Sequence, residues 1–141
     1  MRASVLGLLL ASSLFVGTGC SEYHYFDVTA ELDTTLNGNG VRSTIQRCWV
    51  TVSNANGGIE DEFLLPRGGN DLSCALSSQS SGTFEYSTKG SGSLKFTFSV
   101  YDGQMTTPNC EIGRGETTVE DKETTNFGSL TVMTNNSGGC T

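Results

Sequence analysis

The single histidine of the chain, His24, is the first residue to examine for chemistry, because a nucleophilic triad needs a base. The sequence offers it no partner: it contains no G-x-S-x-G elbow, and no cysteine is placed as a nucleophile. His24 falls at a core position of an alternating segment, which favours a partly buried structural residue. We therefore predict that the protein is not an enzyme, with an unrecognised hydrolase as the weaker alternative.

Two acidic clusters are the other candidates for chemistry. A glycosidase needs two carboxylates that face one substrate, but Glu60–Glu62 are consecutive, and neighbouring side chains in a strand face opposite ways. The same holds for the cluster of Glu120, Asp121 and Glu123. Calcium is a weaker alternative, since a D-x-[DN]-x-[DN]-G loop is absent. We predict no metal site and no cofactor, and interpret both clusters as solvated edges or turns that discourage edge pairing.

The chain has five cysteines, an odd number, which leaves one thiol to explain in an exported protein. Zinc is not expected, because no C-x-x-C pair is present and there is one histidine. Four of the cysteines suit two disulfides in an oxidising compartment: Cys48, Cys74, Cys110 and Cys140. Three pairings are possible. We favour Cys48 with Cys74 and Cys110 with Cys140, because each pair closes a short segment.

The fifth cysteine, Cys20, follows an export signal. Arg2 supplies a basic start, Val5–Val16 is nearly all apolar, and small residues precede the cysteine. The stretch Gly17-Thr18-Gly19-Cys20 resembles a bacterial lipobox. This resemblance implies a cleaved signal peptide at residues 1–19 and a lipid on Cys20.

Two alternatives to the lipobox remain open. Gly17 and Gly19 also satisfy ordinary signal peptidase, which would cut the same bond. A retained membrane helix is the other possibility, although the strongly apolar part is shorter than the roughly 20 residues that a bilayer requires. Under the lipobox interpretation, residues 20–22 are the lipid anchor and a short tether. Ser21 follows the lipidated cysteine at a position where an aspartate would retain the protein at the inner membrane. A serine there resembles the pattern of outer-membrane sorting. The side of the membrane that the protein faces is left open.

Charge and length limit the remaining choices. The formal net charge is −7, which makes nucleic acid an unlikely partner because phosphate binding needs a basic footprint. Residues 23–141 are enough for one domain with a single core. Aromatic and β-branched residues are spread along this region, which argues against disorder.

Alternation of apolar and polar residues predicts strands, and no stretch after Cys20 shows helical periodicity. A turn is expected at Asn37–Gly40, and Pro66 marks the preceding strand as an edge or loop. The predicted strands cover residues 24–33, 44–53, 63–65, 72–76, 83–88, 94–101, 110–119 and 127–134. Short strands without crossover helices favour an all-β fold, an antiparallel immunoglobulin-like β-sandwich of seven or eight strands stapled by disulfides, with a barrel as the alternative.

The segment Leu94–Thr134 looks like the closing strands of small surface lipoproteins from gliding and predatory bacteria. The residues that carry this likeness are Tyr101-Asp102-Gly103, Cys110–Gly115 and a Thr-rich final strand. The resemblance implies a sandwich at the cell surface and assigns no activity.

Trp49 is the residue whose direction is least expected, because it opposes Cys48 and Val50 in its strand. It is core if both faces of the strand are covered. Otherwise it contacts a sugar or a protein partner, with Tyr86 or Tyr101 nearby. We predict a lipid-anchored outer-membrane module that binds or assembles another envelope component; a surface adhesin or carbohydrate-binding module is the alternative.

Overall fold

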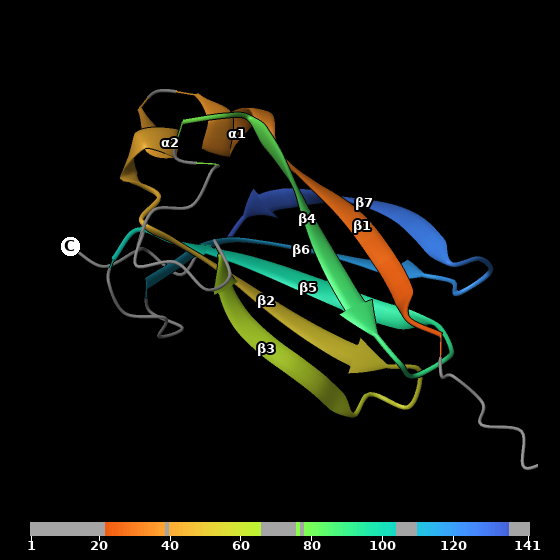
Figure 1. Cartoon of the computed structure of the whole chain (residues 1–141). Helices are drawn as coiled ribbons and strands as arrows, with labels where there is room; N and C mark the ends of the chain where they lie inside the picture. Colours follow the sequence, from red (N-terminus) through yellow and green to blue (C-terminus); the bar gives the residue numbers. More distant parts are fainter. Residues whose placement is uncertain (1–21, 39, 66–75, 77, 104–109, 136–141) are drawn as a thin grey trace, which may run out of the picture.

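The computed structural model of the chain describes residues 22–38, 40–65, 76, 78–103 and 110–135, which form seven strands and two short helices (Figure 1). The strands are β1 (His24–Leu32), β2 (Arg47–Asn54), β3 (Ile59–Leu65), β4 (Ser81–Thr88), β5 (Leu94–Tyr101), β6 (Glu111–Val119) and β7 (Thr125–Thr134). The prediction of an all-β fold is confirmed. Of the strand predicted at 72–76, only Leu76 lies within the described residues, and it is buried.

Two helices of four residues each, α1 (Thr34–Asn37) and α2 (Val41–Thr44), replace the predicted turn after β1. Asp33 caps the N-terminus of α1, since its side chain accepts a hydrogen bond from the backbone N–H of Leu36 at 2.8 Å. Gly40 precedes α2 with a φ of 77°, a conformation that glycine adopts without strain. Helices this short leave no periodic pattern in a sequence. Within the described residues, no helix is long and apolar enough to cross a membrane.

The strands form one sheet in the order β3-β2-β5-β6-β7-β1-β4. Neighbouring strands are antiparallel except β1 and β7, which run parallel from Tyr25 opposite Thr125 to Leu32 opposite Val132. The prediction of a wholly antiparallel sheet is therefore wrong at this pair. Parallel pairing needs a long connection, and here the connection contains the five other strands.

The sheet curls so that β7, β1 and β4 cover one face of β3, β2, β5 and β6 (Figure 1). Aromatic rings fill the space between these two layers: the Phe26 and Phe96 ring centroids are 5.7 Å apart, and Phe63 of edge strand β3 stacks on Tyr86 of edge strand β4 at 6.2 Å. Inward residues alternate with outward ones along each strand, as a half-buried sheet requires. The largest fully buried side chains are Phe26, Phe96, Phe98, Leu36, Leu76, Val28, Val50, Val52, Val100, Val132 and Cys48.

The two layers join where β6 meets β7. Their pairing is limited to Gly113 opposite Thr134 and Arg114 opposite Met133. Beyond that point β7 crosses the inner side of β6 so closely that a Cβ atom on Gly115 would overlap the Thr131 carbonyl oxygen. Glycine at this position permits the close approach of two backbones.

We expect Gly115→Ala to lower the free energy of unfolding by about 1–3 kcal/mol. The new Cβ atom would overlap the Thr131 backbone carbonyl, which, unlike a side chain, cannot rotate away. Gly90→Ala is the matched control, since its Cβ atom would meet only the Thr88 hydroxyl, at 3.4 Å. Urea denaturation followed by circular dichroism measures both. Equal stability of the two variants would contradict this account of the β6–β7 crossing.

Candidate functional site

Three turns and the start of β1 gather at one end of the molecule, which we call the N-terminal end (Figure 1). The strand registers require this, because His24 pairs with Thr88 at the end of β4, and Leu94 at the start of β5 pairs with Val119 at the end of β6. The turns are residues 55–58, 89–93 and 120–124. α1 and α2 lie at the opposite end.

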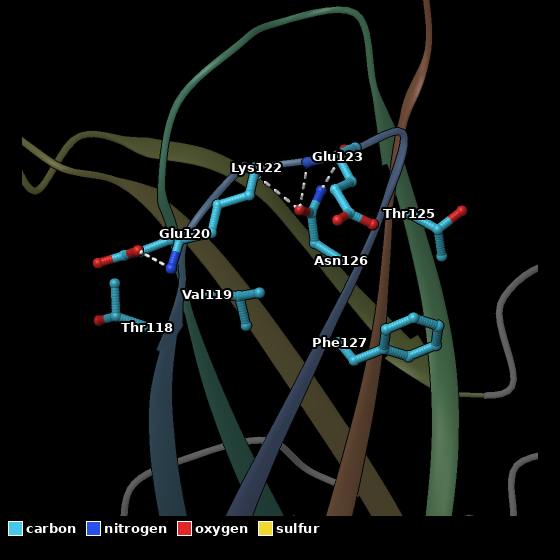
Figure 2. A pocket seen from close by; sticks show the side chains of 8 residues that line it. All are labelled: Thr118, Val119, Glu120, Lys122, Glu123, Thr125, Asn126 and Phe127. Carbon is cyan, nitrogen blue, oxygen red and sulfur yellow. Dashed lines mark hydrogen bonds and ion pairs between the residues drawn. The ribbon is translucent and has the colours of Figure 1, made fainter.

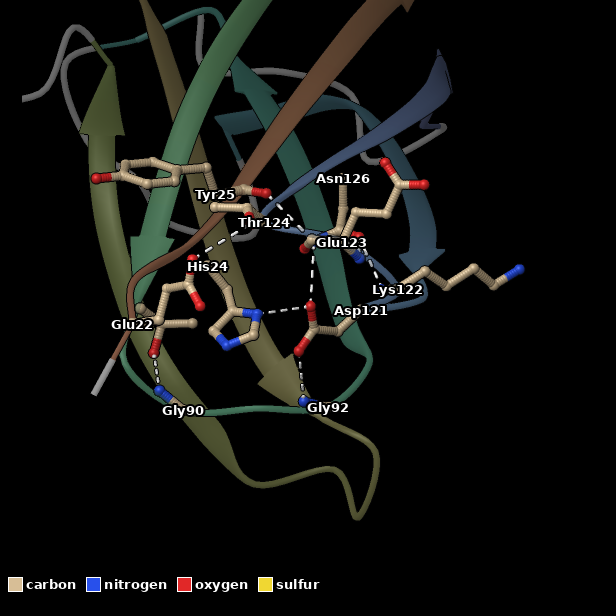
Figure 3. A network of polar contacts seen from close by, with 11 residues as sticks. Glu22, His24, Tyr25, Gly90, Gly92, Asp121, Lys122, Glu123, Thr124 and Asn126 are labelled. Atoms are coloured by element: carbon tan, nitrogen blue, oxygen red, sulfur yellow. Dashed lines mark hydrogen bonds and ion pairs between the residues drawn. The ribbon is translucent and has the colours of Figure 1, made fainter. Parts of the chain in front are cut away.

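Asp121 is the centre of a polar network at this end (Figure 3). Only 6% of its side chain is exposed. Its carboxylate accepts hydrogen bonds from the Gly92 backbone N–H at 3.0 Å and from the Asn126 amide at 3.1 Å, and lies 2.9 Å from Nδ1 of His24. One side chain thus connects β1, the β4–β5 turn and the β6–β7 turn.

Asn126, also buried, completes the network. Its side-chain oxygen accepts hydrogen bonds from the backbone N–H groups of Lys122 and Glu123, at 2.8 and 3.1 Å. Its amide group donates to the carbonyl oxygens of Glu123 and Tyr25. These bonds satisfy backbone groups of a tight turn and attach that turn to β1.

The pKa of the Asp121 carboxyl is lowered, first by the hydrogen bond from the Gly92 backbone; burial acts in the opposite sense, and His24 and Asn126 also lower the pKa. A charged aspartate beside a histidine is two thirds of a catalytic triad. Within the described residues, however, no serine, threonine or cysteine side chain is hydrogen-bonded to the His24 ring. The arrangement supports a structural role that holds three chain segments together.

A shallow hollow of about 500 Å³ lies next to this network (Figure 2). Glu120 and Lys122 form an ion pair of 2.7 Å on its rim, and the exposed Phe127 ring marks another edge. Figure 2 shows side chains spread around an open surface rather than converging on one point. In the part of the chain that the structure describes, no group of three or more His, Cys, Asp or Glu side chains is placed to hold a metal ion. The hollow is lined by Thr118, Val119, Glu120, Lys122, Glu123, Thr125, Asn126 and Phe127.

Of the cysteines singled out in the sequence, Cys48 and Cys110 are described. Both are buried, and both are in the disulfide-bonded state. Cys20, Cys74 and Cys140 lie outside the described residues. The lipid on Cys20 and the pairing of the other four therefore stay predictions.

The three aromatic residues that we considered for ligand contact do not form one surface. Trp49 is half-buried on the outer side of β2, opposite Leu64 and Ser99 of the neighbouring strands. Tyr86 is buried in the core, on the other side of the sheet. Tyr101 is also buried, and its hydroxyl donates to Glu111 at 3.5 Å.

The acidic clusters have different outcomes. β3, which carries Glu60–Glu62, is an edge strand as predicted, since among the described strands it pairs with β2 alone. The interpretation of the second cluster is wrong for Asp121, because its side chain is buried and accepts several hydrogen bonds. Sequence reasoning also missed Asn126 and the exposed Phe127. The sequence signal for this network was the spacing of Asp121 and Asn126, which lie five residues apart across a short polar turn. Side chains of both types form hydrogen bonds with nearby backbone groups.

We expect Asp121→Asn to lower the free energy of unfolding by about 1–3 kcal/mol at neutral pH, because charge-assisted hydrogen bonds are lost from a buried site. Because the pKa of Asp121 is lowered in the folded protein, its charged carboxylate stabilises the fold at every pH above the usual pKa of a carboxyl group. This stabilisation is lost as the pH falls through the folded-state pKa. The gap between wild type and variant should therefore narrow in acid. Urea denaturation between pH 7 and pH 3 measures it, and Glu120→Gln, at the exposed rim, should show no comparable gap. A gap independent of pH would contradict this role.

No protein-family model and no curated protein matches the chain. Among solved structures, the chain is similar to a fimbrial assembly protein from Parabacteroides distasonis ATCC 8503, with a TM-score of 0.44 and 10% sequence identity over 79% of this chain and 52% of the other. The chain thus spans about half the length of that protein.

Proposed function

We propose that the protein is a lipid-anchored, non-enzymatic module of a bacterial cell envelope that binds or helps to assemble another envelope component. The observation that carries this proposal is the position of β1. Its first residue, His24, is separated from Cys20 only by Ser21, Glu22 and Tyr23. An extended chain of this length spans on the order of 10 Å. A lipid on Cys20 would therefore hold the folded strands close to the membrane surface.

The proposal includes the finer features of the fold. The two-layer packing of the curled sheet supports an immunoglobulin-like sandwich, and the buried, oxidised Cys48 and Cys110 support a disulfide staple. We propose that the disulfide bonds join Cys48 to Cys74 and Cys110 to Cys140. Outer-membrane sorting rests on Ser21, which follows the lipidated cysteine.

A short tether gives the module a fixed orientation. The N-terminal end, with its three turns, would face the membrane. Tyr23 is 46% exposed there, its ring centroid is 6.5 Å from that of Tyr25, and Nζ of Lys89 lies 5.0 Å from the Tyr23 centroid. Amphipathic tyrosines and snorkelling lysines are favoured at the depth of lipid headgroups. The outer faces of the layers and the end with α1 and α2 would remain available to partners.

A binding role is preferred to catalysis because the His24–Asp121 pair is occupied in holding three segments together. The hollow beside it is shallow and presents no converging reactive groups. Carbohydrate binding is less favoured. Of the three aromatic residues considered for ligand contact, Tyr86 and Tyr101 are buried, so neither can join Trp49 in contacting a sugar.

Lipidation is tested by Cys20→Ser in the full-length chain. Acylation needs the cysteine sulfur, so the variant should lose the mass of the lipid and leave the detergent phase after phase separation. Intact mass spectrometry of wild type and variant gives the result. A variant that is cleaved at the same bond and still partitions fully into detergent would overturn the anchor.

Orientation is tested with a fluorescent amino acid placed in turn at Ala55, in a turn at the N-terminal end, and at Asn37, in α1; both positions are exposed. A quencher attached to the lipid headgroups should dim the probe at Ala55 several-fold more than the probe at Asn37. In the Cys20→Ser background the difference should disappear. Equal quenching in the lipidated protein would contradict an upright module on a short tether.

A further inference from the structure

The outer side of the layer formed by β7, β1 and β4 combines acidic and apolar groups. We call it the acidic face and define it by Asp27, Glu31, Glu85, Phe127 and Met133. All five occupy outward positions of their strands, alternating with buried residues. The surface is continuous across β1 and β4, as shown by the 2.8 Å hydrogen bond between the hydroxyls of Thr29 and Thr83.

Two of the acids repel each other by their position. Asp27 and Glu85 are direct partners in the register of β1 and β4. Directly opposite residues on one face have Cβ atoms about 4.5–5.5 Å apart, and like charges there are destabilising. A cation placed between the two carboxylates would turn this repulsion into attraction.

The protein supplies no such cation on this layer. β1, β4 and β7 contain no lysine or arginine. Within the described residues, no ion pair involves Asp27, Glu31 or Glu85. The opposite layer differs, because Glu116 pairs there with Lys95 at 2.7 Å.

Exposed apolar side chains lie beside the unpaired acids. Phe127 is 77% exposed and Met133 is 61% exposed, both on β7, and the register places Phe127 directly beside Asp27. Carboxylates and an open aromatic ring are the groups that together recognise an arginine or lysine side chain: the charge pairs with the acid, and the cation lies over the ring.

We propose that the acidic face docks a partner protein whose surface presents arginine or lysine beside apolar side chains. This inference rests on the proposed binding function and names the surface and the chemistry of its partner. A second copy of the chain does not fit, because a two-fold contact through this face would bring three acids against three acids. Anionic lipid headgroups do not fit for the same reason.

The test uses the full-length protein in uncharged detergent and a labelled six-residue peptide of alternating arginine and leucine, with a glutamate–leucine peptide as the second probe. Binding is measured by fluorescence anisotropy. We expect only the arginine–leucine peptide to bind. The triple variant Asp27→Asn, Glu31→Gln, Glu85→Gln should bind it roughly tenfold more weakly, since each exposed ion pair contributes a factor of roughly two.

The matched control removes three exposed acids from the opposite layer: Glu60→Gln, Glu62→Gln and Glu116→Gln. Both triple variants have the same net charge, so general attraction of a cationic peptide to an acidic protein weakens equally in both. The control should lose less than roughly threefold in affinity. Equal losses in the two variants, or no binding of the arginine–leucine peptide to wild type, would overturn the proposal.

Phe127→Ser tests the apolar part without changing charge, and should weaken binding roughly threefold through loss of the ring contact. Unchanged affinity would remove the ring from the docking surface. Thermal unfolding of every variant shows that the fold is retained. Because the assay in detergent does not need the lipid, its result is independent of the test on Cys20, and failure of one leaves the other standing.

Discussion

The approach of β7 to β6 is the constraint on which the rest of the structure depends. The end of β7 must pair with the start of β6, β7 must cross the inner side of β6 at Gly115, and it must still run parallel beside β1. A side chain at the crossing would push the two backbones apart and separate the layers that enclose the aromatic core. The close crossing therefore determines whether Phe26, Phe96 and the rings around them are covered.

The N-terminal end is fixed by polar groups in a similar way. Asp121 and Asn126 bond to one another and to the backbone of three segments, so this end has a defined shape although its turns are polar and two of them contain two glycines each. A defined end is what a short tether requires, because a tether gives an orientation only to a body that is rigid where it is attached. Under the proposed anchor, the outer faces of the two layers would be the surfaces available to partners.

Much of the fold was predictable from sequence, and the reasons are local. Leu94–Tyr101 was identified with the bounds that the structure shows, because its alternation is strict and both of its neighbours are strands. The parallel pairing of β1 with β7 was not predictable, since period-two patterns state which residues point inward but not which strand lies beside which. Asp121 was misread for a related reason: its partners His24 and Gly92 come from distant parts of the chain, whereas the run of acids around it suggested solvent. Phe127 was assigned to a strand, but its outward direction depends on the layer that β7 joins.

The pairing of β1 with β7 also has a consequence for the order of folding. These are the first and the last strands of the sheet, so their contacts have nearly the greatest sequence separation that the described chain allows. Contacts between residues far apart in the sequence form late and slow the folding of small domains. The entropy cost of closing a long loop comes before the favourable energy of the contact. One side of β1 can pair with β4 as soon as residue 88 is available, whereas the other stays uncovered until β7 arrives. A chain that ends before residue 125 would thus expose the unpaired edge of β1 and leave the aromatic core uncovered on one side. Pairing of β7 is therefore the folding step that protects the chain from aggregation.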